Sequence, residues 1–179
     1  MCRLSAIVSN EYFSPMENIM ALETMKEGHD GSGLGMILRD LGGEFAELKE
    51  FPILSGICTH TGIEMLDEYM VKVGFKTKHL WTPDINLKPG MHIKKRDFYF
   101  ARAYEYPEWI MDKDQHEKEF LLLKTRLALR EMGLKDQNIH IFSFWPDLIT
   151  LKEEGDPLEV GEFFGFDKKP VMAKKVLAQ

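Results

Sequence analysis

The chain has little cysteine: only Cys2 and Cys58 occur among its 179 residues. Two thiols cannot form a multi-disulfide framework, and they cannot ligate a four-cysteine iron–sulfur cluster. The first residues also lack the basic segment followed by an apolar one that is typical of a secretion signal. We therefore expect reduced thiols and a cytoplasmic protein.

Positive charge is also scarce, since 23 Lys and Arg residues face 29 Asp and Glu residues and give a net charge of −6. This balance argues against a nucleic-acid partner, because no basic surplus is available to neutralise phosphates. No apolar run approaches the roughly 20 residues of a transmembrane helix, so no membrane partner is expected. A hydrophobic content of 44% with 29% charged residues is typical of a globular protein. The length fits a single domain over residues 1–179.

Two kinds of site are excluded by what the motifs lack. The glycine-rich stretch 28–35 has no Gly-Lys-Ser/Thr ending, follows a predicted helix and opens a predicted strand. A phosphate loop needs a helix N-terminus directly after its glycines, so nucleotide binding is not expected here. Cys58 and His60 could donate two metal ligands, whereas a zinc site needs three or four. We expect no metal and no cofactor in this chain.

Helices and strands alternate irregularly along the sequence. Ser14, Pro15 and Glu17 form a capping box that should start a helix ending near Glu27, before Gly28. Asp156 should cap the helix predicted over residues 157–164. The remaining elements are expected as strands 4–9, 36–38, 53–59, 97–104, 139–144, 148–152 and 171–179, and helices 62–73, 112–132 and 157–164. Without a regular βαβ rhythm, the pattern favours the α+β class.

The helix over 112–132 has the clearest pattern. It contains no glycine, and Phe120, Leu123 and Leu127 recur at helical spacing. These three side chains are therefore expected to face the core. Gly133 is expected to end the helix.

Cys2 is the strongest candidate for chemistry. If Met1 is removed, a thiol and a free α-amine belong to the same residue. The thiolate is the reactive form of cysteine, and an α-amine with a pKa of about 7.7–8.0 can accept the thiol proton near neutral pH. A terminal amine is a known base for such a nucleophile. The alternative is that Cys2 merely precedes a strand.

Two segments together carry a resemblance to a known family. Residues 1–7, Met-Cys-Arg-Leu-Ser-Ala-Ile, and residues 27–35, Glu-Gly-His-Asp-Gly-Ser-Gly-Leu-Gly, resemble class II glutamine amidotransferases. These N-terminal-nucleophile hydrolases usually begin Cys-Gly-Ile and carry a second block close to Arg-Gly-x-Asp-Ser-x-Gly. Cys2, Gly28, Asp30 and Gly33 match the family pattern. Residues 156–164 resemble a later segment of the glutamate synthase type.

The resemblance implies a four-layer αββα sandwich with stacked antiparallel sheets, of which this chain is expected to form the front portion. It also implies that Cys2 attacks L-glutamine, while Gly28, Asp30, Gly31 and Gly33 line the substrate pocket. Ammonia would pass to a synthase domain or subunit that carries FMN and iron–sulfur centres. Strands 4–9 and 36–39 are expected to be adjacent and antiparallel, with the first helix on one face.

The chain also departs from the family. Arg3, Leu4, Glu27 and Gly31 replace family residues. No His-x-Arg sequence is present to supply the arginine that holds the substrate carboxylate, and no Asn-Gly pair is present to supply the oxyanion hole. Removing one oxyanion donor typically costs about 10²–10³ in rate. The open alternatives are completion by further residues or a partner chain, a non-catalytic assembly or regulatory subunit, and a different N-terminal-nucleophile amidohydrolase.

Overall fold

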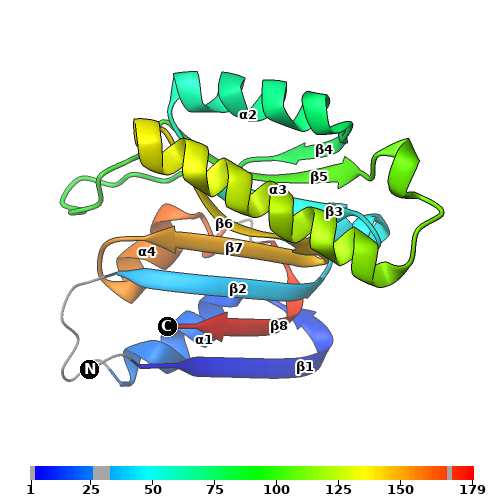
Figure 1. The fold of residues 1–179 in the computed structure, drawn as a ribbon. Helices are drawn as coiled ribbons and strands as arrows, with labels where there is room; N and C mark the ends of the chain where they lie inside the picture. Colours follow the sequence, from blue (N-terminus) through cyan, green and yellow to red (C-terminus); the bar gives the residue numbers. More distant parts are fainter. Residues whose placement is uncertain (1–2, 26–32, 169–170) are drawn as a thin grey trace. The chain divides into compact units, whose positions relative to one another are not determined.

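The computed structural model describes residues 3–25, 33–168 and 171–179. These residues form two compact units, and each is described by itself. Unit 1 comprises residues 1–47, 83–95 and 150–179, and unit 2 comprises residues 48–82 and 96–149. Each unit is built around one four-stranded sheet (Figure 1). The predicted α+β class is therefore confirmed, while the single domain stays a prediction.

Unit 1 is built on sheet 1, whose strand order is β1-β8-β2-β7. Its elements are β1 (Ser5–Phe13), α1 (Pro15–Glu23), β2 (Leu34–Leu41), β7 (Leu148–Glu153), α4 (Pro157–Phe163) and β8 (Ala173–Ala178). Helix α1 packs against β1 and β8, and α4 packs against α1. A 3₁₀ helix, η1 (Gly43–Leu48), follows β2.

The helix caps of unit 1 confirm the sequence signals. The Ser14 side chain accepts a hydrogen bond from the Met16 N–H at the start of α1. The Asp156 carboxylate does the same for the Leu158 N–H at the start of α4. Both caps satisfy a backbone donor that has no partner within the helix. The predicted end of α1 near Glu27 is wrong, because the helix ends at Glu23 with Thr24 as its C-cap.

The predicted pairing of the first two strands is also wrong. Strand β8 lies between β1 and β2 and pairs antiparallel with both. Ala178 of β8 is opposite Ser5 on one side and opposite Met36 on the other. Two strands that are both antiparallel to a third run parallel to each other. The C-terminal strand of this chain therefore separates two strands that were expected to be neighbours.

Unit 2 is built on sheet 2, with the strand order β4-β5-β3-β6 and antiparallel pairing throughout. Its elements are β3 (Pro52–Cys58), α2 (His60–Val73), β4 (Lys76–Trp81), β5 (Phe98–Glu105), η2 (Glu108–Ile110), α3 (Gln115–Asp136) and β6 (Ile139–Pro146). Strand β4 was not predicted. Lysines alternate with other residues along β4, and most of its side chains are exposed, as is typical of an edge strand.

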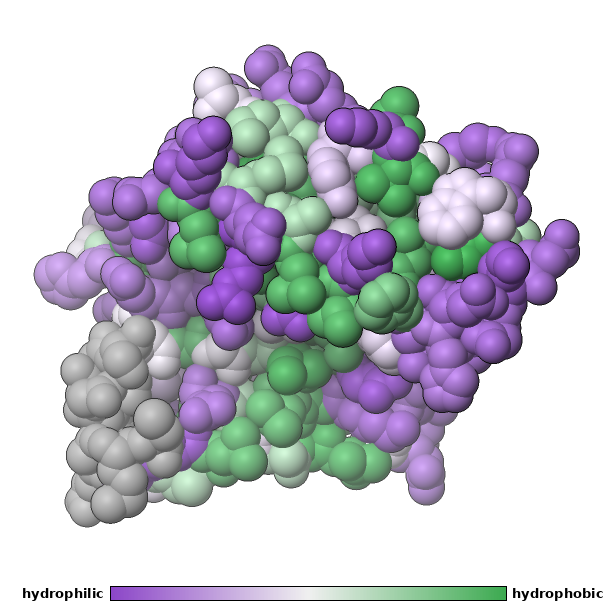
Figure 2. All heavy atoms as spheres, viewed as in Figure 1, coloured by the Kyte–Doolittle hydropathy of each residue, from purple (hydrophilic) through white to green (hydrophobic). Residues whose placement is uncertain are grey.

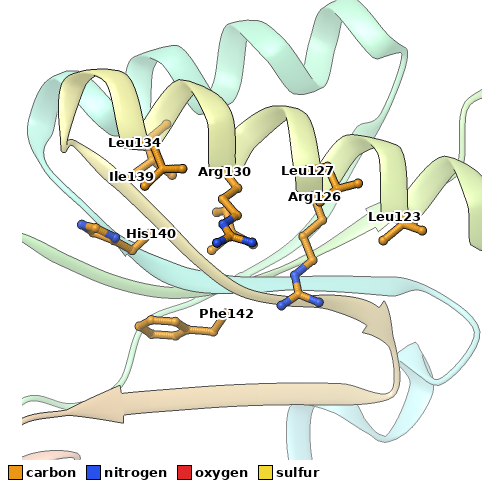
Figure 3. A pocket seen from close by; sticks show the side chains of 9 residues that line it. Leu123, Arg126, Leu127, Arg130, Leu134, Ile139, His140 and Phe142 are labelled. Carbon is orange, nitrogen blue, oxygen red and sulfur yellow. The ribbon is translucent and has the colours of Figure 1, made fainter.

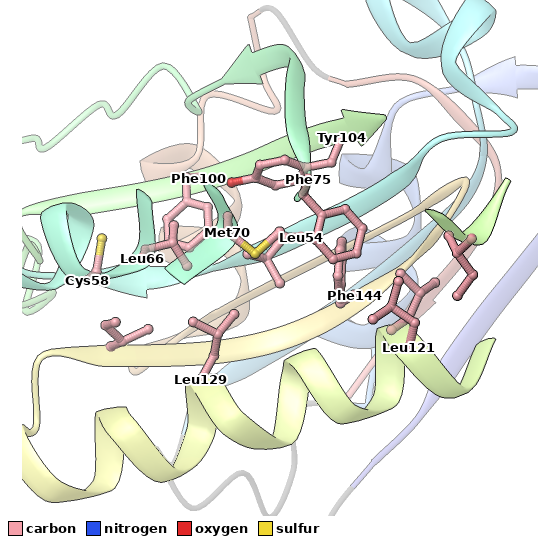
Figure 4. Close-up of a cluster of buried hydrophobic side chains, with 13 residues drawn as sticks. Leu54, Cys58, Leu66, Met70, Phe75, Phe100, Tyr104, Leu121, Leu129 and Phe144 are labelled. Carbon is pink, nitrogen blue, oxygen red and sulfur yellow. The ribbon is translucent and has the colours of Figure 1, made fainter. Parts of the chain in front are cut away.

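The core of unit 2 is an apolar cluster of 13 buried side chains from both helices and the sheet (Figure 4). Leu66 of α2, Leu129 of α3 and Leu54 of β3 are each fully buried in it. Phe75 and Phe144 meet edge to face at a ring distance of 5.3 Å. Both helices therefore cover the same face of sheet 2.

Helix α3 turns a different face to this core than the sequence predicted. Phe120, Leu123 and Leu127 were expected inside, yet they are 61%, 48% and 47% exposed. Leu122 and Leu129 are buried in their place. The predicted stop at Gly133 is also wrong, because the helix continues to Asp136 and ends with Gln137 in the left-handed conformation.

Gly133 has a packing role instead. A Cβ atom at this position would lie 1.9 Å from the Ile139 carbonyl oxygen, so only glycine allows α3 to approach β6 this closely.

Among the helices that the structure describes, none has an apolar stretch long enough to cross a membrane.

Candidate functional site

The described parts of the two sequence blocks that suggest a site, residues 3–7 and 33–35, lie at one end of sheet 1. Of the predicted site residues, Cys2, Gly28, Asp30 and Gly31 lie outside the described residues, and their roles stay predictions. Gly33 is described, as are the two strands that follow the blocks. The geometry of the candidate site is therefore built from β1, β2 and the strand between them.

The first residue of β1 and the third residue of β2 are opposite the same residue of β8. Ser5 and Met36 are opposite Ala178 on its two sides. Gly35 and Gln179 exchange two backbone hydrogen bonds, of 2.8 and 2.9 Å. The described residues next to Cys2 and those next to the glycine-rich stretch thus lie at the same end of sheet 1, on either side of β8.

A buried asparagine fixes this end of β1. Asn18 of α1 is fully buried, and its side-chain Nδ2 donates to the carbonyl oxygens of Ser5, at 3.1 Å, and Val176, at 3.0 Å. The Ser5 hydroxyl donates to Asn18 Oδ1 at 2.6 Å. Each of the two amide protons and the amide oxygen has a partner, so the amide can be buried without a large desolvation penalty. Asn18 thereby ties the start of β1 to both α1 and β8.

Sequence reasoning missed Asn18, although a signal was present. The buried positions of α1 are Pro15, Asn18, Ile19 and Leu22, which follow the spacing of a single helix face. An asparagine on such a face needs internal hydrogen-bond partners. The position could therefore have been singled out as a buried polar anchor.

Gly33 occupies a place that no other residue fits. Its φ angle is +120°, a region that side-chain-bearing residues rarely adopt. An added Cβ would lie 2.4 Å from the Glu153 carbonyl oxygen at the end of β7. Gly33 therefore sets the path by which the glycine-rich stretch enters β2.

The second cysteine has the properties of an inert thiol. Cys58 is 5% exposed at the end of β3, within the core of unit 2. Burial raises the pKa of the Cys58 thiol to about 12, although the positive charge of Arg102 acts in the opposite direction. Arg102 itself is paired with Asp67 of α2. Because the thiolate is the nucleophile, a thiol with such a pKa is unreactive near neutral pH.

The possible metal ligands near Cys58 do not converge. His60 Nδ1 lies 3.4 Å from Asp97 Oδ2, in an exposed pair. Within residues 3–25, 33–168 and 171–179, no group of three or more His, Cys, Asp or Glu side chains is arranged to hold a metal ion.

Comparison with known proteins adds no family. No protein-family model matches the chain, and a search of curated proteins finds no match either.

Proposed function

We propose that this chain is a glutamine amidotransferase component of the glutamate synthase type, with Cys2 as its nucleophile. In this proposal the two sheets stack as the central layers of an αββα sandwich, and the protein acts in the cytoplasm. The observation that carries the proposal is the strand register of sheet 1. Ser5, which follows Cys2 in the sequence, and Met36, which follows the glycine-rich stretch, are opposite the same residue, Ala178.

The chemistry follows from a thiol and an amine on one residue. The Cys2 sulfur forms a bond to the side-chain amide carbon of L-glutamine while the Cys2 amine takes up the thiol proton. The protonated amine then gives its proton to the amide nitrogen, the carbon–nitrogen bond breaks, and ammonia leaves. Water hydrolyses the resulting γ-glutamyl thioester, which releases glutamate and restores the thiol.

The described residues contribute support for this nucleophile. Asn18 fixes the position of Ser5 at the start of β1, and Ser5 follows Cys2 closely in the sequence. Gly33 fixes the entry of the glycine-rich stretch into β2. Gly28, Asp30 and Gly31 are proposed to line the glutamine pocket, as the family resemblance implies. FMN and iron–sulfur centres would belong to a synthase partner that uses the ammonia.

Mutation of the two cysteines tests the proposal. In the protein purified together with its synthase partner, Cys2→Ala should abolish glutamine-dependent glutamate formation and spare ammonia-dependent synthesis, because ammonia enters after the thioester step. Cys58→Ala is the matched control and should retain glutamine-dependent activity. Glutamine-dependent turnover by Cys2→Ala at the wild-type rate would refute the proposal.

A non-catalytic assembly or regulatory subunit is the second candidate. The sequence observation that favours it is the lack of both His-x-Arg and Asn-Gly, which leaves the substrate carboxylate and the oxyanion without their family ligands. This candidate predicts no glutamine-dependent turnover by wild-type protein in the presence of the partner. It also predicts that loss of the chain impairs assembly of that partner.

A further inference from the structure

Helix α3 has a second apolar face that the described residues leave about half exposed. Phe120, Leu123, Leu127 and Leu134 are between 47% and 64% exposed. At 3.6 residues per turn, these four side chains fall within about 60° of one another around the helix. Figure 2 shows hydrophobic side chains gathered along this helix, with hydrophilic ones beside them. An apolar stripe of this kind on a protein surface marks an interaction site.

The stripe borders a groove between α3 and β6. The groove has a volume of about 480 Å³, and its lining includes Leu123, Leu127 and Leu134. Its charged and titratable lining groups are Arg126, Arg130 and His140, and no acidic residue of the described ranges lines it. Figure 3 shows the side chains of Arg126 and Arg130 pointing from α3 toward β6. The groove is thus apolar with a basic side.

The two arginines have no counter-charge within the described part of the chain. Neither Arg126 nor Arg130 forms an ion pair with a described residue, whereas Arg102 of the same unit is paired with Asp67. The chain as a whole carries a net charge of −6, so this groove has the opposite sign to the rest of the protein. Guanidinium groups bind carboxylates through paired hydrogen bonds.

We propose that this groove docks an amphipathic helix of a partner protein, with apolar residues on one side and carboxylates along its edge. From Phe120 to Leu134 the stripe is about 21 Å long, which matches a partner helix of about four turns. Apolar anchors at helical spacing enter the groove, and flanking carboxylates meet Arg126 and Arg130. This inference does not depend on the chemistry of Cys2.

A second copy of this chain fits the groove less well than an acidic partner. An antiparallel pair of α3 helices with its two-fold axis at Leu127 would place Lys124 opposite Arg130 of the other copy. A parallel pair would place Arg130 beside Arg130. Like charges placed opposite each other in an interface disfavour that pairing. In these two pairings a second copy meets like charges, whereas a partner with carboxylates meets charges of opposite sign.

Two synthetic peptides test the proposal. The probe is a fluorescein-labelled 16-residue helical peptide with leucines on one face and glutamates flanking them. Its counterpart carries lysine at every glutamate position. Fluorescence anisotropy at low ionic strength should show that the acidic peptide binds at least tenfold more tightly than the basic one. This preference should shrink at 0.5 M NaCl, because salt screens the charge pairs.

Charge reversal supplies the control. The double substitution Arg126→Glu and Arg130→Glu should reverse the preference, so that the basic peptide binds more tightly. Lys49→Glu makes the same type of charge change at an exposed position of the same unit and should leave the preference unchanged. All of these positions are exposed, so circular dichroism should show that each variant remains folded.

Several results would overturn the proposal. One is equal binding of both peptides, or no binding of either. A second is a preference that the arginine reversal leaves unchanged. A third is a concentration-dependent dimer in sedimentation experiments that Leu127→Glu abolishes, since a second copy would then be the occupant. A fourth is binding to phosphatidylserine vesicles that the acidic peptide does not displace.

Discussion

Sheet 1 and sheet 2 each contain four strands, but β1, at the edge of sheet 1, and β3, inside sheet 2, are held by different forces. Strand β1 of sheet 1 has mostly half-buried or exposed residues, and the start of the strand is fixed by the polar contacts of Asn18. Strand β3 of sheet 2 is buried along almost its whole length and contributes to the apolar cluster. Directional hydrogen bonds define the position of a strand end, whereas apolar packing supplies most of the folding free energy. Unit 1 thus contains the candidate geometry with its polar anchor, whereas β3 of unit 2 is held by an apolar core.

Removal of a ring from the unit 2 core should have the largest effect. Phe144 is 3% exposed and contacts the rings of Phe75 and Tyr104 edge to face. Phe144→Ala should lower the free energy of unfolding by about 3–5 kcal/mol, because it leaves a cavity in a packed core. Urea denaturation measures this change. Phe120→Ala deletes the same ring at an exposed position of α3 and should cost less than about 1 kcal/mol. Equal losses in both variants would contradict the assignment of the core.

Removal of the polar anchor in unit 1 should cost less, with a local signature. Asn18→Ala leaves the Ser5 and Val176 carbonyl oxygens without their buried donor. We expect a loss of about 2–3 kcal/mol in the free energy of unfolding. Relative to the wild type, amide hydrogen exchange should accelerate more in β1 and β8 than in the strands of sheet 2.

Asn10→Ala is the matched control for this variant, since Asn10 is an exposed asparagine of β1, the strand that Asn18 anchors. It should change neither stability nor exchange in β8. If the two alanine variants exchange alike, Asn18 does not anchor β1.

A pair of glycine variants sharpens the comparison at the end of sheet 1. Gly33→Ala places a Cβ against the Glu153 carbonyl in an unfavourable backbone conformation, and it should cost about 1–2 kcal/mol. Gly35→Ala meets only ordinary contacts, the nearest at 3.7 Å, and should cost less than about 0.5 kcal/mol. Thermal unfolding of both variants measures the difference. A Gly33→Ala protein as stable as Gly35→Ala would show that the strand entry is not constrained by Glu153.

The smallest effect concerns pH. Because burial raises the pKa of folded Cys58 to about 12, above that of an unfolded thiol, the folded state holds the thiol proton more tightly. The contribution to stability is therefore complete below about pH 8.5 and is lost as the pH rises toward 12. In a Cys2→Ala background, the rate of Cys58 modification by iodoacetamide should be negligible at pH 8 and should increase above pH 10. Rapid modification at pH 8 without denaturant would contradict the burial of this thiol.

Local sequence signals predicted the helices and strands themselves better than they predicted which strands pair with one another. The caps at Ser14 and Asp156 depend on nearby backbone groups, and both are present in the structure. The insertion of β8 between β1 and β2 depends on a pairing between the two ends of the chain, which local patterns do not encode. Strand pairing was therefore the part of sheet 1 that could not be predicted.

Helix α3 shows a second limit of pattern reading. Its sequence contains two apolar faces, one with Leu122 and Leu129 and one with Phe120 and Leu127. Periodicity finds both faces but does not say which one the sheet covers. The close approach at Gly133 selects the first face, and the second forms the groove.

For the candidate site, sequence motifs identified Cys2 and the glycine-rich stretch but missed Asn18. The motifs are contiguous in sequence and could be compared with a family pattern. Asn18 acts through contacts with Ser5 and Val176, and the Val176 contact exists only after the C-terminal strand has joined the sheet. Its role therefore required the fold.

The most direct test of the account is the site of covalent labelling by a diazo-ketone analogue of glutamine. The protein with its synthase partner is treated at pH 7.5, digested and analysed by mass spectrometry, with intact mass recording whether Met1 has been removed. If Cys2 is the nucleophile, we expect an N-terminal Cys2 that carries the label, protection of Cys2 by L-glutamine, and an unlabelled Cys58. Labelling of Cys58 with Cys2 unmodified, or a retained Met1 with no label on Cys2, would contradict the assignment of Cys2 as the nucleophile.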